Sequence, residues 1–112
     1  MKIEKTERGF ALAEFTDRYG VKCSLQKSSL ATEDAIWFGV TDHDPQIMAR
    51  DASVMGRQDL LAPIGTPERL NGWVKYLLPE AVHINTRMHL TQEMVRELLP
   101  LLVRFAETGE IE

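Results

Sequence analysis

The first third of the chain alternates apolar and polar residues in the way that is typical of paired strands. Residues 9–16 predict one strand, with Phe10 and Leu12 on one of its faces. Residues 21–25 predict a second strand, because Val, Cys and Leu alternate there with polar side chains. Between them, residues 17–20 begin with Asp and end with Gly, which favour the two ends of a turn. The two runs therefore predict a β-hairpin.

Three further strands follow from the same pattern. Residues 36–40 are apolar on both sides, which indicates a central strand of a sheet. Residues 73–78 predict a fourth strand, and residues 82–90 predict a fifth with the most regular alternation in the chain. The even-numbered positions of this fifth run are apolar or Thr, so they predict a core face that a helix can cover.

Two helices are predicted as well. Residues 45–55 predict a short one, with Asp44 as N-cap and Pro45 at the first position, where a missing N–H is tolerated. Residues 91–108 predict a long helix that has Thr91 as N-cap and stops at Gly109. Pro100 predicts a kink within it, because proline removes a backbone hydrogen bond and clashes with the preceding turn.

These elements predict a single α+β domain over residues 1–112. We expect an antiparallel sheet of about five strands, with the C-terminal helix packed on one face and the short helix after the third strand. Residues 1–8 are expected to form a polar lead, and residues 56–72, which show no sustained period, a long surface loop. A chain of 112 residues has the usual length of one domain.

Charge and composition narrow the choice of partners. The net charge of −4 offers no broad basic surface, so binding to duplex nucleic acid is disfavoured. A local basic pocket for a small anion is compatible with this charge, because net charge describes the whole surface. The lone cysteine, Cys23, alternates with core positions and predicts a buried thiol. We expect a cytoplasmic protein without membrane contact, since residues 1–9 lack a signal-peptide pattern and no stretch reaches about 20 apolar residues.

The other face of the fifth predicted strand is the main candidate for chemistry. It aligns two imidazoles, an amide and a guanidinium, from His83, Asn85, Arg87 and His89. Arginine suits phosphate and other planar anions through paired hydrogen bonds. The predicted ligand-binding set also includes Gln26, Ser28, Ser29 and Trp73. The alternative is a solvated sheet face, which antiparallel sheets commonly have.

Other polar groups favour structural roles. Asp42, His43 and Asp44 have no strong metal-ligand spacing, and no metal or other cofactor is expected. The serines and histidines lack a nucleophile elbow or a triad spacing, so no catalytic residue is assigned and the chain is not expected to be an enzyme. Trp37 and Trp73 favour core packing, and Trp73 is the better candidate for partial exposure and stacking.

Two groups of motifs resemble a family of small proteins that is widespread in phages and prophages. They are Asp17-Arg18-Tyr19-Gly20, Cys23-Ser24-Leu25-Gln26-Lys27-Ser28-Ser29, Glu33-Asp34-Ala35-Ile36-Trp37, Thr86-Arg87-Met88-His89-Leu90-Thr91, Leu98-Leu99-Pro100 and Phe105 to Gly109. The resemblance covers most of the chain apart from the N-terminal lead and residues 56–72. It carries over no enzymatic activity and no catalytic residue.

The resemblance implies an accessory phage protein that counters host defence. The first hypothesis is a homo-oligomer that binds and sequesters a small anionic ligand, such as a cyclic or modified nucleotide signal. The second is a protein–protein inhibitor of a host defence complex, similar in action to an anti-CRISPR protein, and it rests on the negative charge and the predicted loop. A third is a small enzyme that acts on a nucleotide or metabolite, with His43, His83 or His89 as acid or base.

Overall fold

The structure is a computed structural model that describes residues 1–62 and 71–112. Its contacts divide the chain into two compact units. We call Met1–Asp42 together with Asn85–Glu112 the sheet unit, and His43–Ile84 the insert unit. That the whole chain forms one domain stays a prediction.

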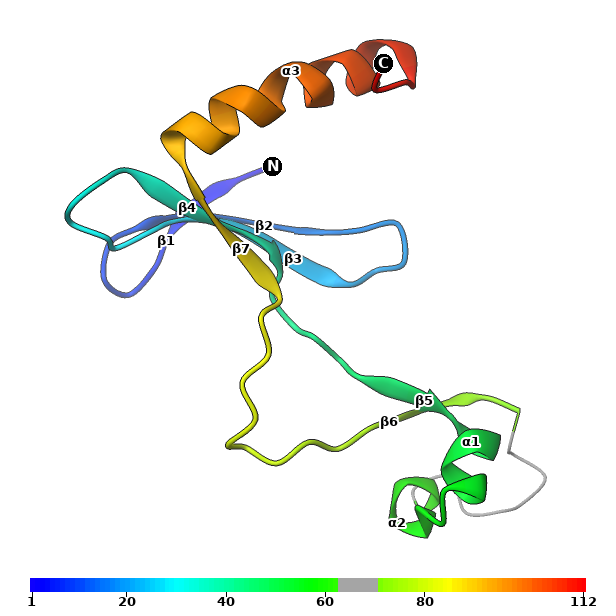
Figure 1. Cartoon of the computed structure of the whole chain (residues 1–112). Coiled ribbons are helices and arrows are strands. Elements are labelled where there is room, and N and C mark those ends of the chain that lie inside the picture. The colour runs from blue at the N-terminus through cyan, green and yellow to red at the C-terminus, as the bar shows by residue number, and fades with distance from the viewer. Residues whose placement is uncertain (63–70) are drawn as a thin grey trace. The chain divides into compact units, whose positions relative to one another are not determined.

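The sheet unit is built on an antiparallel sheet (Figure 1). Among the described residues it has five strands, in the order β1-β2-β3-β4-β7. Their bounds are Ile3–Lys5 (β1), Ala11–Thr16 (β2), Lys22–Lys27 (β3), Ala35–Val40 (β4) and Arg87–Thr91 (β7). The predicted α+β class, with a five-stranded antiparallel sheet, a C-terminal helix and a short helix after the third predicted strand, is confirmed.

Two of the five strands differ from those predicted. Part of the predicted polar lead forms β1, which pairs with β2 through Glu4 and Leu12. The predicted fifth strand is shortened to Arg87–Thr91, because β4 ends at Val40 and its pairing with β7 begins at Gly39 and Arg87. Residues 82–86 alternate as a strand would, but β4 does not extend far enough to pair with them.

The insert unit contains the predicted fourth strand, but in a separate ladder. Here β6 (Trp73–Lys75) pairs with β5 (Gln46–Met48) and does not join the main sheet. Two short helices follow β5, namely α1 (Ala49–Val54) and α2 (Gln58–Leu61). The second one lies inside the predicted loop 56–72, of which residues 63–70 lie outside the described part. The core of this unit consists of Ala49, Ala52, Leu60 and Val74.

The predicted start of the short helix is wrong. Met48 occupies the N-cap position of α1, and its side chain makes no capping hydrogen bond. Pro45 lies before β5, where its carbonyl oxygen accepts a hydrogen bond of 2.8 Å from the backbone N–H of Tyr76. Pairing with β6 therefore holds the segment that capping chemistry alone would have made helical.

The C-terminal helix α3 (Gln92–Thr108) has the predicted ends. The Thr91 hydroxyl accepts a hydrogen bond of 3.2 Å from the Met94 N–H, and Gly109 adopts the left-handed conformation of a C-cap. The helix continues through Pro100. Along the residues that the structure describes, no helix has the length and apolar character needed to cross a membrane.

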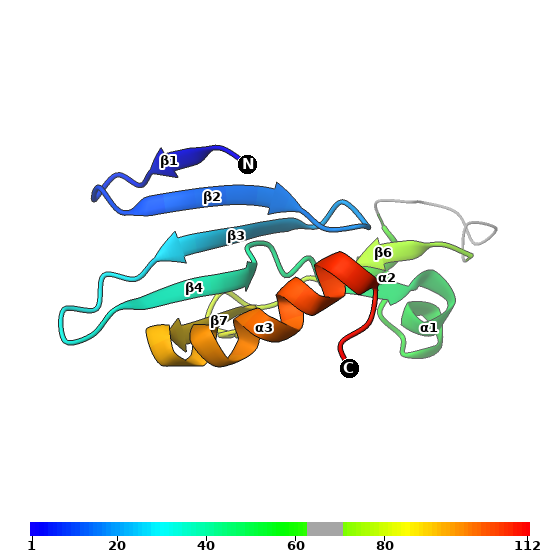
Figure 2. The ribbon, with the colours of Figure 1, turned by 90° about the horizontal axis from the view of Figure 1, so that it is seen from above.

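The helix leaves most of its apolar side chains exposed. It follows β7 directly and lies over one side of the sheet (Figure 2). All seventeen residues of α3 are described, and none of them is buried. Val95 and Leu98 near its start are half-buried, whereas Phe105 near its end is 57% exposed. Packing of α3 on the sheet is thus limited to its first turns.

Candidate functional site

The pairing register decides which side chains share a face of the sheet. Gln26, Trp37 and His89 are successive partners across β3, β4 and β7. Gly39 and Arg87 form a neighbouring pair two residues along the same strands. Since side chains alternate along a strand, these positions lie on one side of the sheet. We call the side chains of Gln26, Trp37, Arg87 and His89 the polar face.

Trp37 is the centre of the polar face. The His89 ring stacks on it, with 3.9 Å between the ring centroids and an angle of 6° between the planes. The Arg87 guanidinium carbon lies 5.5 Å from the Trp37 ring centroid, within the range of a cation–π interaction. Arg87 and His89 are two residues apart on β7, so both reach the same indole.

Hydrogen bonds hold the two β7 side chains in place. Arg87 Nη1 donates to Gln26 Oε1 over 3.1 Å, and His89 Nε2 lies 2.9 Å from Ser28 Oγ. The Leu30 N–H donates to the same Ser28 oxygen over 3.2 Å, so the serine hydroxyl hydrogen is available to His89. Ser28 is 5% exposed, so its hydroxyl is largely shielded from water.

The start of β7 approaches β4 closely at Gly39. A Cβ atom on Gly39 would lie 2.6 Å from the carbonyl oxygen of Thr86 and 3.0 Å from Arg87 Cα. The φ angle of Gly39 is 149°, which side chains rarely adopt. A glycine is therefore needed where β7 brings Arg87 onto the polar face.

An ion pair closes the loop that carries Ser28 and Ser29. Lys27 Nζ donates to Asp34 Oδ1 over 2.7 Å, and the Ser28 N–H donates to the Ala35 carbonyl over 3.0 Å. The hydrogen bond from Lys27, together with its positive charge, lowers the pKa of Asp34 below its usual value. Both contacts join the end of β3 to the start of β4.

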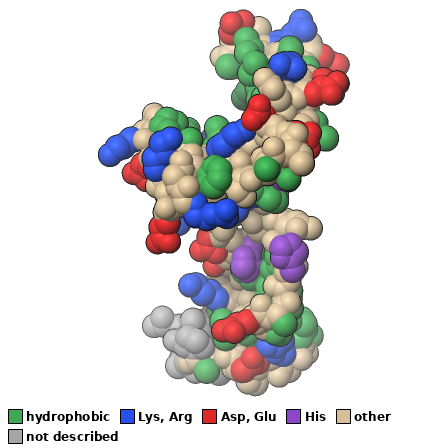
Figure 3. Space-filling view, turned by 90° about the vertical axis from the view of Figure 1, so that its left-hand side faces the viewer, with side chains coloured by type: hydrophobic (Ala, Val, Ile, Leu, Met, Phe, Trp, Pro, Cys, Tyr) green, Lys and Arg blue, Asp and Glu red, His purple; other side chains and the backbone are tan. Residues whose placement is uncertain are grey.

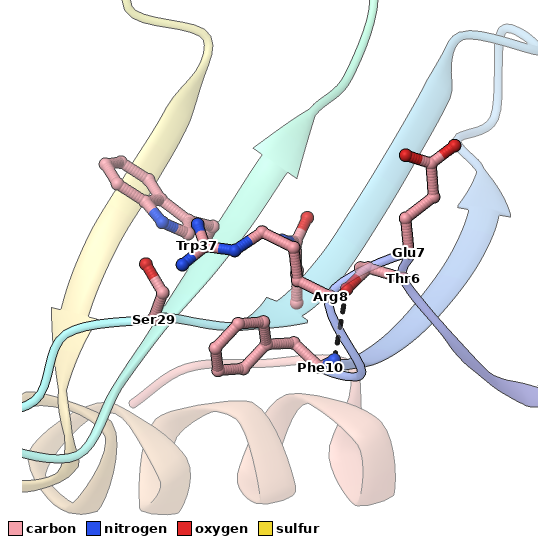
Figure 4. A pocket seen from close by; sticks show the side chains of 7 residues that line it. Thr6, Glu7, Arg8, Phe10, Ser29 and Trp37 are labelled. Carbon is pink, nitrogen blue, oxygen red and sulfur yellow. Dashed lines mark hydrogen bonds between the residues drawn. The ribbon is translucent and has the colours of Figure 1, made fainter.

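A hollow of about 340 Å³ adjoins the polar face. It is lined by Thr6, Glu7, Arg8, Phe10, Gln26, Ser29 and Trp37. Figure 4 shows Arg8 extending from the β1–β2 turn toward Trp37 and Ser29, with Phe10 below. Thr6 shapes this turn, because its hydroxyl accepts a hydrogen bond of 3.0 Å from the Phe10 N–H.

Two guanidinium groups thus each lie near an aromatic ring that lines the hollow. The Arg8 guanidinium carbon is 5.6 Å from the Phe10 ring centroid, and Arg87 lies over Trp37. Figure 3 shows Lys and Arg side chains on the visible face, with Asp and Glu side chains among them. Arg8 and the Trp37 ring line the hollow together with the Glu7 carboxylate, so an anion bound there would meet one guanidinium and a flat ring beside one acidic group.

The structure brings together four of the eight predicted ligand-binding residues. Gln26, Ser28, Arg87 and His89 form one hydrogen-bonded and stacked group. Ser29 lines the adjoining hollow. Asn85 belongs to the sheet unit but precedes β7, whereas Trp73 and His83 belong to the insert unit.

Sequence reasoning missed Trp37, Arg8 and Phe10. Trp37 was assigned to the core because its strand is apolar on both sides. Its alternation with Ile36 and Phe38 could have indicated a different face from theirs. Arg8 and Phe10 were missed because β1 was not predicted, and without it the β1–β2 turn has no defined position.

The remaining candidate groups carry no chemistry of this kind. Cys23 is buried and unpaired by any disulfide within the described chain, in agreement with a structural thiol. Within residues 1–62 and 71–112, no group of three or more His, Cys, Asp or Glu side chains is placed to hold a metal ion.

Comparison with known proteins identified no relative of this chain. No protein-family model, no curated protein and no solved structure matches the chain. The resemblance to small phage proteins therefore stays a prediction from the motifs, and function has to be argued from the geometry of the sheet unit.

Proposed function

We propose that the protein binds and sequesters a small anionic ligand of the nucleotide class without converting it. The observation that carries the proposal is the pair of arginines beside Trp37 and Phe10, next to a hollow of about 340 Å³. A nucleotide combines a phosphate with a flat base, and these are the two features that guanidinium and aromatic groups recognise. The hollow has the size of a small-molecule site.

The polar face is prepared for such a ligand. Gln26 accepts one hydrogen bond from the Arg87 guanidinium, which has five N–H donors and can still offer a pair of them to a phosphate. The His89 ring of β7 stacks on the Trp37 indole, and the buried Ser28 hydroxyl of the β3–β4 loop contacts His89 Nε2. A site organised before binding loses less conformational entropy when the ligand arrives.

Binding without conversion is the reading that the side chains support. His89 is the histidine of the polar face, and its Nε2 is occupied by the contact with Ser28 while its ring is held against Trp37. A general base needs hydrogen-bond reach to the proton that it removes. The resemblance of the motifs to small phage proteins implies a counter-defence role, and it is the polar face that favours sequestering a nucleotide signal over inhibiting a protein.

Isothermal titration with AMP, cyclic AMP, cyclic di-GMP and ADP-ribose tests the proposal. We expect at least one of these probes to bind, and Arg87→Ala to weaken that binding about 10- to 100-fold, as the loss of hydrogen bonds to a charged group predicts. Arg18→Ala is the matched control, because Arg18 is exposed in the β2–β3 turn. Chromatography of the ligand after incubation should recover it unchanged.

A second readout separates binding from folding. Trp73 is 65% exposed in the insert unit, so Trp73→Phe leaves Trp37 as the tryptophan that reports on the polar face. Ligand should change the Trp37 fluorescence in this variant. If Arg87→Ala unfolds, Arg8→Ala replaces it, since Arg8 is exposed on the turn. Failure of all four probes to bind would overturn the proposal and favour the protein–protein inhibitor.

A further inference from the structure

The helix α3 presents apolar side chains on more than one side. One strip, with Val95 and Leu98, begins over the sheet and is half-buried there. A second strip contains Leu99, Pro100 and Val103, which are spaced so as to share another side of the helix. Leu99 is 51% exposed and Val103 is 45% exposed. A helix that is apolar on several sides is typically buried on several sides.

A shallow hollow runs along this second strip. It has a volume of about 560 Å³ and is lined by Leu99, Pro100, Val103, Arg104, Glu107 and Thr108. Arg96 precedes Leu99 by three residues and lies on the same side of the helix, as Glu107 does four residues after Val103. We call Arg96, Leu99, Pro100, Val103 and Glu107 the outer strip. It is apolar in the middle, with Arg96 at one end and Glu107 at the other, and Arg104 lines the same hollow beside Glu107.

We propose that the outer strip binds the same strip of a second copy of this chain, with the two α3 helices antiparallel. When the two-fold axis passes between positions 101 and 102, Arg96 lies opposite Glu107 of the partner subunit, and Pro100 opposite the partner's Val103. Leu99 then lies opposite Arg104 of the partner subunit, whose aliphatic stem can cover it while the guanidinium stays in water. Arg96 and Glu107 are paired with the opposite charge at both ends of the strip. This self-complementarity is what an isologous interface requires.

The small number of buried apolar residues in the sheet unit favours a second copy of the chain as the partner of the outer strip. Among its described residues, the buried hydrophobic ones are Ala13, Cys23 and Ala35, and none is large. Larger apolar side chains of the sheet, such as Phe15, Leu25 and Phe38, are half-buried, so association can bury more apolar surface in this unit. A second copy of the chain is present wherever the chain is made, so this partner is always available to cover the exposed apolar side chains of α3.

Sedimentation velocity over a range of concentrations tests the dimer. We expect the wild-type chain to sediment as a dimer at micromolar concentration, and Val103→Glu to shift the dissociation constant upward at least tenfold. Leu30→Glu is the control, because Leu30 is a 42%-exposed residue of the β3–β4 loop. A wild-type chain that stays monomeric at every concentration would overturn the proposal, as would a Val103→Glu variant that remains as dimeric as the wild type.

Charge exchange tests the register. Arg96→Glu and Glu107→Arg each place like charges opposite one another in their own dimers, so each variant alone should dimerise several-fold more weakly. Mixed together, they restore opposite charges at both ends, and native mass spectrometry should show the mixed dimer in excess of either pure one. A statistical mixture of the three dimers would rule out this register. These outcomes do not depend on any nucleotide, so they are independent of the proposed function.

Discussion

The insert unit and the sheet unit close their apolar surfaces to different degrees. In the insert unit Leu60 is 3% exposed and Val74 is 7% exposed, and Ile47, Leu61 and Tyr76 pack against them. In the larger sheet unit, the buried hydrophobic residues within the described ranges are two alanines and a cysteine. The difference arises because two helices contact each other and the β5–β6 ladder in the insert unit, whereas α3 contacts the sheet chiefly at β7.

The polar face therefore lies on a sheet whose large apolar side chains are not fully buried. The polar face is held by the stack of His89 on Trp37, the Arg87–Gln26 hydrogen bond and the buried Ser28 hydroxyl. Such contacts fix side-chain directions but bury little apolar area. In the proposed dimer, association along α3 adds buried apolar surface to the sheet unit.

The largest effect is expected for Leu60→Ala in the insert unit. Removing a side chain that is 3% exposed leaves a cavity and should cost about 2–5 kcal/mol of unfolding free energy. Hydrogen exchange at the backbone amides of α2 and β6 measures this loss. Leu77→Ala is the matched control, because Leu77 is 66% exposed and should change stability by less than about 0.5 kcal/mol. Equal losses in the two variants would contradict the closed core of the insert unit.

In the sheet unit, Gly39→Ala should cost about 1–3 kcal/mol, because the new Cβ meets the β7 backbone and the φ angle is unfavourable. Amides of β7 should exchange faster, and ligand binding should weaken with them. Gly72→Ala serves as the control, since a Cβ there meets no atom within 4 Å. If β7 exchanges at the wild-type rate, the close approach at Gly39 does not position Arg87.

The smallest effect concerns the exposed ion pair in each unit. Lys27→Ala should raise the pKa of Asp34 toward its usual value, while the pKa of Asp59, lowered by Arg57 in the insert unit, should not move. Carboxyl NMR titration of both residues measures this. Because the folded pKa of Asp34 lies below its unfolded value, the pair stabilises the loop above about pH 4 and loses that effect as pH falls through the folded pKa.

A wild-type loop whose stability rose on acidification would contradict this sign. The effect on stability should be slight, because exposed ion pairs are screened by solvent and salt. Movement of the Asp59 pKa in the Lys27→Ala variant would show that the two units are electrostatically coupled, which the separate ion pairs do not predict.

Local chemistry made some elements predictable. The β2–β3 hairpin was predicted from its turn, where the Asp17 carboxylate accepts hydrogen bonds of 2.8 and 3.0 Å from the N–H groups of Tyr19 and Val21. The ends of α3 were predicted from Thr91 and Gly109. In each case the decisive hydrogen bond joins residues within four positions of each other, so the residue types alone carry the information.

Other elements depended on partners far away in the chain. Ile3–Lys5 is a strand because β2 offers its edge, and Trp73–Lys75 leaves the main sheet because β5 is its partner. The pairings of Gln26 with Arg87 and of Ser28 with His89 each span 61 residues. Alternation predicted which β7 side chains share a face, but not which strand lies beside them.

By itself, the sequence determined the class of fold, the hairpin, the capped C-terminal helix and the alternation that separates Arg87 and His89 from Met88 and Leu90. Tertiary structure alone decided that Trp37 lies against both Arg87 and His89, that Arg8 and Phe10 reach the same hollow, and that α3 leaves most of its apolar side chains exposed. The physical reason is the distance along the chain over which each interaction acts. Capping, turn formation and side-chain alternation act between near neighbours, whereas register and burial depend on which distant segments meet.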